Sequence, residues 1–231
     1  MGKFLHSFFS PLGFRRAVPQ VWDGFQTNIK LMVIAEVLVL IFALAVAIIR
    51  GLPGRGTFPL RAFAVGYTDF FRGTPLILVA YVWGLGIPAL HIAVISDQSL
   101  FTYGIIALTL VYTAYVTEVY RAGIESVHPS QRMAARSLGL TYAQTMRHVV
   151  LPQALRMSFA PTVGFLVQLI KGTSLAAIIG FVELSRSGQL VSSITYKPLL
   201  AFGLVAVCYF AICFPLSRYS ARLERRLAVA R

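Results

Sequence analysis

Residues 118–156 read EVYRAGIESVHPSQRMAARSLGLTYAQTMRHVVLPQALR and separate two strongly hydrophobic parts of the chain. The stretch contains five arginines. Pro129 suits the first turn of a helix and Gly139 provides a stop, so the pattern predicts a short helix over 130–138. Thr141 and Gln144 have the spacing of a capping box, which predicts a second helix that continues to Pro152. A loop organised in this way predicts a docking surface outside a membrane.

The composition indicates an integral membrane protein. Of the 231 residues, 57% are hydrophobic and only 13% are charged, which lies outside the range of soluble domains. The net charge of +13 does not indicate nucleic-acid binding, because the basic residues cluster at the ends of apolar runs, where they orient membrane spans. Cys208 and Cys213 share one apolar run and are predicted to be buried, reduced thiols.

No pattern in the sequence favours an enzyme. The eight acidic residues are scattered singly, and the four histidines do not pair at metal-ligand spacing. The chain also has no phosphate-binding loop of the form GxxxxGK[ST], so no nucleotide cofactor is predicted for it.

Hydropathy predicts an all-α polytopic fold with five transmembrane helices. The spans are expected at 31–49, 62–85, 100–117, 157–182 and 198–217. The sequence thus divides into an interfacial segment at 1–30, for which a disordered tail is the alternative, a transmembrane domain at 31–217 that includes the loop 118–156, and a basic tail at 218–231.

Two of these spans contain polar interruptions. The second carries Arg72, Gly73 and Pro75, and the fourth carries Lys171 and Gly172. Backbone groups freed by a break in a membrane helix are tolerated only where protein or a cavity satisfies them. Both places are therefore predicted to be helix breaks beside a pathway, although a plain proline kink also fits the first.

The distribution of basic residues predicts the orientation. The loops and tail at 50–72, 118–156 and 218–231 hold 14 Lys and Arg residues, whereas 1–30, 86–99 and 171–197 hold 7. The positive-inside rule then puts the long loop and the C-terminus in the cytoplasm and the N-terminus outside. An N-terminus on the inner side would require an even number of spans.

Several motifs carry a resemblance to a known family. AARSLG at 134–139, LPQALR at 151–156, FRGTP at 71–75 and KGTSL at 171–175 occur in the family's order. Over roughly residues 25–227 the chain resembles permease subunits of bacterial ABC importers. It is most similar to the branch that takes up polar amino acids such as histidine, glutamine, arginine and opines.

The resemblance implies an architecture and a set of partners. Such a permease has five spans, lies in the bacterial inner membrane and pairs with a second permease, either a copy or a paralogue. Two cytoplasmic ATPase subunits bind ATP and Mg²⁺, and an external binding protein delivers the amino acid. The chain is therefore expected to be a non-enzymatic permease without a cofactor of its own. An ATP-independent channel or carrier is the alternative, but it would have no use for the capped arginine loop.

The resemblance also implies a surface that couples the permease to the ATPase. Small residues would let the loop helix sit in a cleft of the ATPase, and arginines would supply charge at the rim of that cleft. The family's acidic residue before the paired alanines is replaced here by Met133. The expected coupling residues are Arg132, Met133, Ala134, Ala135, Arg136, Leu138 and Gly139.

A zwitterionic amino acid needs hydrogen-bond donors and acceptors, which hydroxyls and freed backbone groups supply at broken helices. The candidate pathway residues are Thr74, Tyr112, Thr113, Gln168, Thr173 and Ser174. For each of them, a hydrogen bond between helices is the alternative role. Gly172 and the run Tyr112-Thr113-Ala114 depart from the family's frequent aspartate and Asn-Ser-Gly, which leaves the identity of the amino acid open.

Overall fold

The computed structural model describes the backbone of residues 11–229 and the side chains of residues 13–225, and over this range it contains helices and loops but no strand. This confirms the all-α fold. Residues 1–10 of the predicted interfacial segment and residues 230–231 of the predicted tail lie outside the described range. The elements are α2 (Pro11–Arg50), α3 (Phe58–Gly73), α4 (Leu76–Tyr81), a π-helical turn (Val82–Gly86), α5 (Ile87–Ala89), α6 (Leu100–Ser126), α7 (Pro129–Ser137), α8 (Tyr142–Thr145), a second π-helical turn (Met146–Val150), α9 (Leu151–Gly172), a 3₁₀ helix (Thr173–Ile179), α10 (Leu184–Thr195) and α11 (Pro198–Val229).

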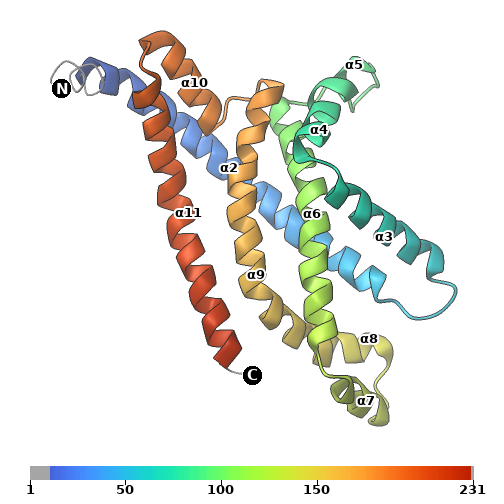
Figure 1. The fold of residues 1–231 in the computed structure, drawn as a ribbon. Coiled ribbons are helices and arrows are strands. Elements are labelled where there is room, and N and C mark those ends of the chain that lie inside the picture. The colour runs from blue at the N-terminus through green and yellow to red at the C-terminus, as the bar shows by residue number, and fades with distance from the viewer. Residues whose placement is uncertain (1–10, 230–231) are drawn as a thin grey trace.

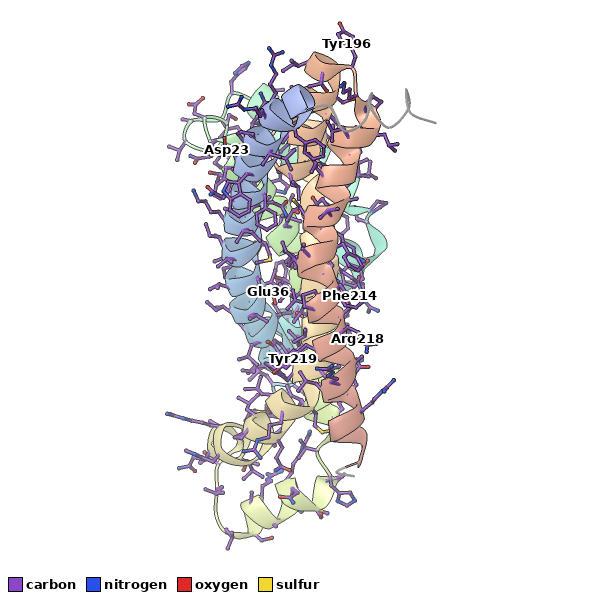
Figure 2. All side chains as sticks on the ribbon, turned by 90° about the vertical axis from the view of Figure 1, so that its left-hand side faces the viewer. Asp23, Glu36, Tyr196, Phe214, Arg218 and Tyr219 are labelled. Carbon is purple, nitrogen blue, oxygen red and sulfur yellow. The ribbon has the colours of Figure 1, made fainter. Side chains whose placement is uncertain are left out.

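The long helices run between two ends of the molecule. The N-terminal end of α2 lies with α10 and α5 at one end, whereas α7, α8 and the C-terminal end of α11 lie at the other (Figure 1). Figure 2 likewise places Asp23 and Tyr196 far from Arg218. In the described part of the chain, four helices are long and apolar enough to cross a membrane, and the bent pair of α3 and α4–α5 makes a fifth if it is counted as one broken span. This agrees with the five predicted spans.

The core forms where α2 packs against α6. The buried residues of α2 recur every four positions, as do those of α6, so each helix presents a continuous ridge to the other. Alanine occupies three of the five α2 positions, which lets the two backbones approach closely. The residues are Leu31, Ala35, Val39, Ala43 and Ala47 on α2 and Leu108, Tyr112, Val116, Tyr120 and Ile124 on α6.

The structure shows no boundary at residue 30. Helix α2 is continuous from Pro11 to Arg50, and its buried stripe extends toward the N-terminus through Asn28, Gly24, Val21 and Ala17. Part of the predicted interfacial segment is thus packed into the bundle. At the other end of the chain, α11 continues past the predicted end of the fifth span at 217 as far as Val229.

The connection between the third and fourth spans is shorter than predicted. Helix α6 extends to Ser126, so the N-terminal part of 118–156 belongs to a span. The capping box is confirmed, because the Thr141 N–H donates to Gln144 Oε1 at 2.8 Å and the Gln144 N–H donates to Thr141 Oγ1 at 3.3 Å. The second helix does not end at Pro152. The chain stays helical through this proline, because α8, the second π-helical turn and α9 follow one another without a gap.

Helix α10 between the fourth and fifth spans was not predicted. Glu183 caps it by accepting the N–H groups of Ser185 and Arg186, both at 2.8 Å, and it also accepts the Tyr209 hydroxyl at 3.2 Å. Burial raises the pKa of this carboxyl, and the backbone hydrogen bonds oppose that shift. The cap fixes α10 against α11.

Gly123 sets the distance between α6 and α9. A Cβ atom at this position would lie 2.1 Å from Ser158 Oγ and 2.8 Å from the Ala154 carbonyl oxygen. We expect Gly123→Val to push the two helices apart and to lower the free energy of unfolding by about 1–3 kcal/mol or more. The measurement is thermal unfolding of the purified chain in detergent. Gly66→Val is the matched control, since nothing lies within 4 Å of that helical position, and an equal loss in both variants would contradict the close packing.

Candidate functional site

The short helix α7 has the ends that the sequence predicts. His128 caps its start, with Nδ1 accepting the Ser130 N–H at 3.2 Å. Gly139 follows its end with φ of +80°, a conformation that glycine adopts readily and other residues adopt at a cost. The Leu140 N–H then donates to the Ala135 carbonyl at 3.2 Å, which closes the helix. The turn after α7 therefore has a defined shape.

The predicted coupling residues do not all face outward. Met133 and Leu138 are 62% and 83% exposed, and we call these two exposed apolar side chains of the α7 region the apolar knob. Ala134 and Arg136 are also exposed, whereas Ala135 is buried against the rest of the chain. The prediction that Ala135 helps to fit a partner's cleft is therefore not supported by its position. Its side chain lies on the inner face of α7.

Arg132 also points back into the protein. It is half-buried, and its guanidinium donates to the carbonyl of Ile124 in the last turn of α6. A cation at this place complements the negative end of the helix dipole. The predicted rim arginine is thus an internal tie between α7 and α6, and the sequence offered no signal for this because the contact depends on how the chain turns at Pro129.

The end of the bundle that holds α7 and α8 is also joined to the loop between the first two spans. The Tyr142 hydroxyl of α8 donates to the carbonyl of Gly51 at 2.6 Å. This bond joins residues 91 positions apart in sequence. The arrangement links α7 and α8 to the end of α2 as well as to α6.

The break in the second span is confirmed. Helix α3 ends at Gly73, α4 begins at Leu76, and the two are bent by 102°, far more than a plain proline kink. The Thr74 hydroxyl donates to the Phe70 carbonyl at 2.8 Å, and the Tyr115 hydroxyl donates to the Arg72 carbonyl at 3.3 Å. Side chains thus satisfy carbonyls that the interrupted helix leaves free.

The sequence predicted a break in the fourth span at Lys171 and Gly172, but the chain remains helical there. The α-helix passes directly into a tighter 3₁₀ helix that begins at Thr173. The Tyr112 hydroxyl donates to the Gln168 carbonyl at 2.8 Å. A Cβ atom at Gly172 would lie 2.5 Å from that hydroxyl, so a side chain at this position would displace Tyr112.

Several predicted residues gather around one cavity of about 430 Å³ between α3, α4, α6 and α9. Its lining combines the break of the second span with hydroxyl and amide groups of α6 and α9. Thr74, Tyr112 and Gln168 are brought together there with the predicted break residues Arg72, Gly73, Pro75 and Gly172. Tyr115, which the sequence analysis did not single out, also lines it.

The other predicted pathway residues lie elsewhere. Thr113 lines a separate apolar cavity of about 570 Å³ between α2, α3 and α6. Thr173 is fully buried and donates to Asn28 Oδ1 at 2.6 Å, which is the interhelical bond considered as the alternative. The Ser174 hydroxyl donates to the Lys171 carbonyl at 2.7 Å, and Lys171 itself is exposed. The structure does not bring these residues to the cavity that holds Tyr112.

Another cavity, of about 380 Å³, lies between α6 and α9, and the charged side chains of Arg72 and Glu118 line it. Glu118 at its edge forms ion pairs with Arg50 and, at 2.8 Å, with Arg121. Arg72 stands 3.8 Å from the same carboxylate. Arg50 also donates to Thr68 at 3.0 Å, so one acidic residue connects α2, α3 and α6.

The tie made by Arg132 is testable. We expect Arg132→Ala to leave α6 folded but to loosen α7, because the guanidinium that holds the α6 terminus is removed. Hydrogen exchange followed by mass spectrometry should show faster exchange over residues 129–137. Arg136→Ala is the control, because Arg136 is exposed and the variant should exchange at the original rate; equal rates in both variants would contradict an internal role for Arg132.

Comparisons with known proteins agree with the resemblance described in the sequence analysis. Residues 43–229 match the family described as "Binding-protein-dependent transport system inner membrane component". The chain is 34% identical over 205 residues to the probable glutamine ABC transporter permease protein GlnM of Bacillus subtilis (strain 168), covering 89% of this chain and 92% of the relative. It is 30% identical over 222 residues to the arginine transport system permease protein ArtQ of the same organism, with 94% and 97% covered.

A solved structure described as "Crystal structure of an amino acid ABC transporter with histidines" has the same fold. The two chains superpose with a TM-score of 0.82 at 29% identity, over 93% of this chain and 97% of the other. The family match covers most of the sequence, and both the broken second span and the loop helix lie within residues 43–229. This chain therefore belongs to the family of inner membrane components of binding-protein-dependent transport systems.

Proposed function

We propose that this chain imports a polar amino acid as one half of an ATP-driven transporter. The observation that carries the proposal is the combination of an apolar knob on a defined helix at one end of the bundle with a polar cavity at a broken span. The first suits a partner that delivers force, and the second suits a small zwitterion. A channel would need the cavity but not the knob.

The partner at the knob would be a dimer of cytoplasmic ATPase subunits, which would bind ATP and Mg²⁺. Met133 and Leu138 would enter a cleft of the ATPase, with Arg136 at its edge. Large apolar side chains that are exposed on a short helix are more stable in a partner's binding groove than in contact with water. Movement of α7 would reach the spans through the Arg132 bond to α6 and the Tyr142 bond to Gly51.

The substrate would occupy the cavity at the second-span break. Its volume of about 430 Å³ falls in the range of small-molecule sites. Thr74, Tyr112 and Gln168 would provide hydrogen bonds to the ammonium and carboxylate groups. The relatives are named for glutamine and for arginine, so a polar amino acid is the class we propose. A second permease, a copy or a paralogue, would cover the open side of the cavity.

The orientation follows from charge. The end that holds α7 carries the more basic loops, so we place it in the cytoplasm and the start of α2 outside the inner membrane. An external binding protein would then deliver the amino acid to the end formed by α10 and the start of α2. This geometry puts the proposed ATPase and the proposed source of substrate on opposite faces.

Reconstitution tests the proposal. The chain, its ATPase and its binding protein are placed in proteoliposomes, and uptake of labelled glutamine, arginine, histidine and glutamate is followed with and without ATP. We expect ATP-dependent accumulation of at least one of them. Equal uptake without ATP would instead indicate a channel or carrier, and no uptake of any of the four would contradict the substrate class.

Leu138 tests the coupling surface. We expect Leu138→Asp to insert normally but to lose the ATPase on purification, because a charge would be desolvated in the cleft. Co-elution on size-exclusion chromatography is the measurement. Tyr196→Asp is the matched control, since Tyr196 is 88% exposed and lies at the opposite end of the bundle (Figure 2). Retention of the ATPase by Leu138→Asp would contradict the docking surface.

A further inference from the structure

The two cavities of the site share a wall. Arg72 and Tyr115 line the cavity at the second-span break and also the cavity beside Glu118. The first cavity contains Tyr112 and Gln168, and the second extends along α6 through Ser126 toward the end that holds α7. These two side chains therefore lie between the two cavities.

Tyr115 is held in place by contacts with two other helices. Its hydroxyl donates to the carbonyl of Arg72 at the end of α3, at 3.3 Å. Its ring stacks on Phe165 of α9, with centroids 5.7 Å apart and planes 24° apart. The ring thus spans the distance from α3 to α9 across the face of α6.

Arg72 is held more loosely than its neighbours. It lies 3.8 Å from Glu118, whereas the Glu118 pairs with Arg50 and Arg121 are closer. The Arg72 side chain is 44% exposed, compared with 14% for Arg50 and 18% for Glu118. A long, solvated ion pair is weak, so Arg72 can leave Glu118 while the other two pairs persist.

The helices that carry the shared wall differ in how firmly they are packed. Helices α6 and α9 are in close contact at Gly123, and Ser158 donates to the Val119 carbonyl at 3.2 Å. The end of α3, by contrast, leads into the 102° bend at Thr74 and Pro75, where the regular helical hydrogen bonds stop. The α3 side is therefore the side of the wall that can move.

We propose that Arg72 and Tyr115 form a gate between the two cavities, and that Glu118 holds the gate closed. Opening separates the Arg72 carbonyl from the Tyr115 hydroxyl and the Arg72 guanidinium from Glu118. The gate depends on the proposed transport function for its purpose, but its existence can be measured without transport.

The experiment reports access to each cavity with a single cysteine. Cys208 and Cys213 are first replaced by serine, and Gln168→Cys then reports the first cavity, while Ser126→Cys reports the second. A membrane-impermeant maleimide is added to sealed vesicles from the side that holds α7. Gln168 is exposed in the single chain, and the proposed second permease covers that side. In the assembled pair we therefore expect Ser126→Cys to react at least tenfold faster than Gln168→Cys, because the gate stands between the reagent and residue 168.

Removing the gate should remove that difference. In the Gln168→Cys protein, Tyr115→Ala and Arg72→Gln are each expected to raise the labelling rate about tenfold, whereas Arg72→Lys, which keeps the charge, should leave it low. Phe159→Ala is the matched control, since it deletes an exposed aromatic ring of α9 that lines neither cavity. Arg72→Gln decides the question if Tyr115→Ala does not assemble, because the Arg72 side chain is half-exposed.

Two outcomes would overturn the gate. One is equal labelling of Gln168→Cys and Ser126→Cys with the wall intact, and the other is slow labelling of Gln168→Cys that neither Tyr115→Ala nor Arg72→Gln changes. Because labelling needs no ATP, either result can occur in a protein that still imports amino acids. Failure of import in proteoliposomes contradicts the proposed function instead and leaves the labelling result to be judged separately.

Discussion

The backbone of a membrane protein must satisfy its polar groups without help from lipid, and α6 meets this requirement for two other helices. Its Tyr115 hydroxyl donates a hydrogen bond to the Arg72 carbonyl where α3 ends, and its Tyr112 hydroxyl donates one to the Gln168 carbonyl near the end of α9. The two tyrosines are three residues apart and so lie on one face of the helix. Because they satisfy these carbonyls, the bundle can interrupt its second span and tighten its fourth around a cavity.

The same helix organises the mechanical contacts. The four-residue ridge of α2 packs along α6 on one side, and α9 approaches it at Gly123 on another. At the C-terminal end of α6, Glu118 gathers arginines from α2 and α3, and the Ile124 carbonyl receives Arg132 from α7. Direct contacts thus connect α7 to α6, and Glu118 connects α6 to α2 and α3.

Features with a local cause could be predicted from the sequence. The ends of α7, the capping box and the break at Gly73 to Pro75 depend on residues a few positions apart, and each is present. The facing of side chains could not be predicted in this way. Thr173 bonds to Asn28 because a helix distant in sequence lies beside it. Arg132 points inward because the chain turns back at Pro129 and brings it to Ile124, eight residues away, and Ala135 is buried on the same short helix.

The N-terminal part of α2 shows a related limit. Apart from Val21, its buried stripe uses Ala17, Gly24 and Asn28, which are small or polar, so hydropathy gave little sign of a packed face. Glycine at position 24 is needed because Ser187 of α10 lies where its Cβ would be. Helix α10 was missed for a similar reason, since it is amphipathic and its apolar side faces α2 and α11. In both cases a partner helix supplies what the local sequence lacks.

The length of α2 has a consequence for the shape of the molecule in its bilayer. Forty residues at 1.5 Å each give a rod of about 60 Å, about twice the roughly 30 Å depth of the hydrocarbon layer. Its N-terminal half, at Ala17 and Val21, packs against α10 and against the start of α11, so three helices brace one another at this end of the bundle. A protein docking from that side would meet a stiff, pre-formed pedestal instead of flexible loops and would lose little entropy in ordering it.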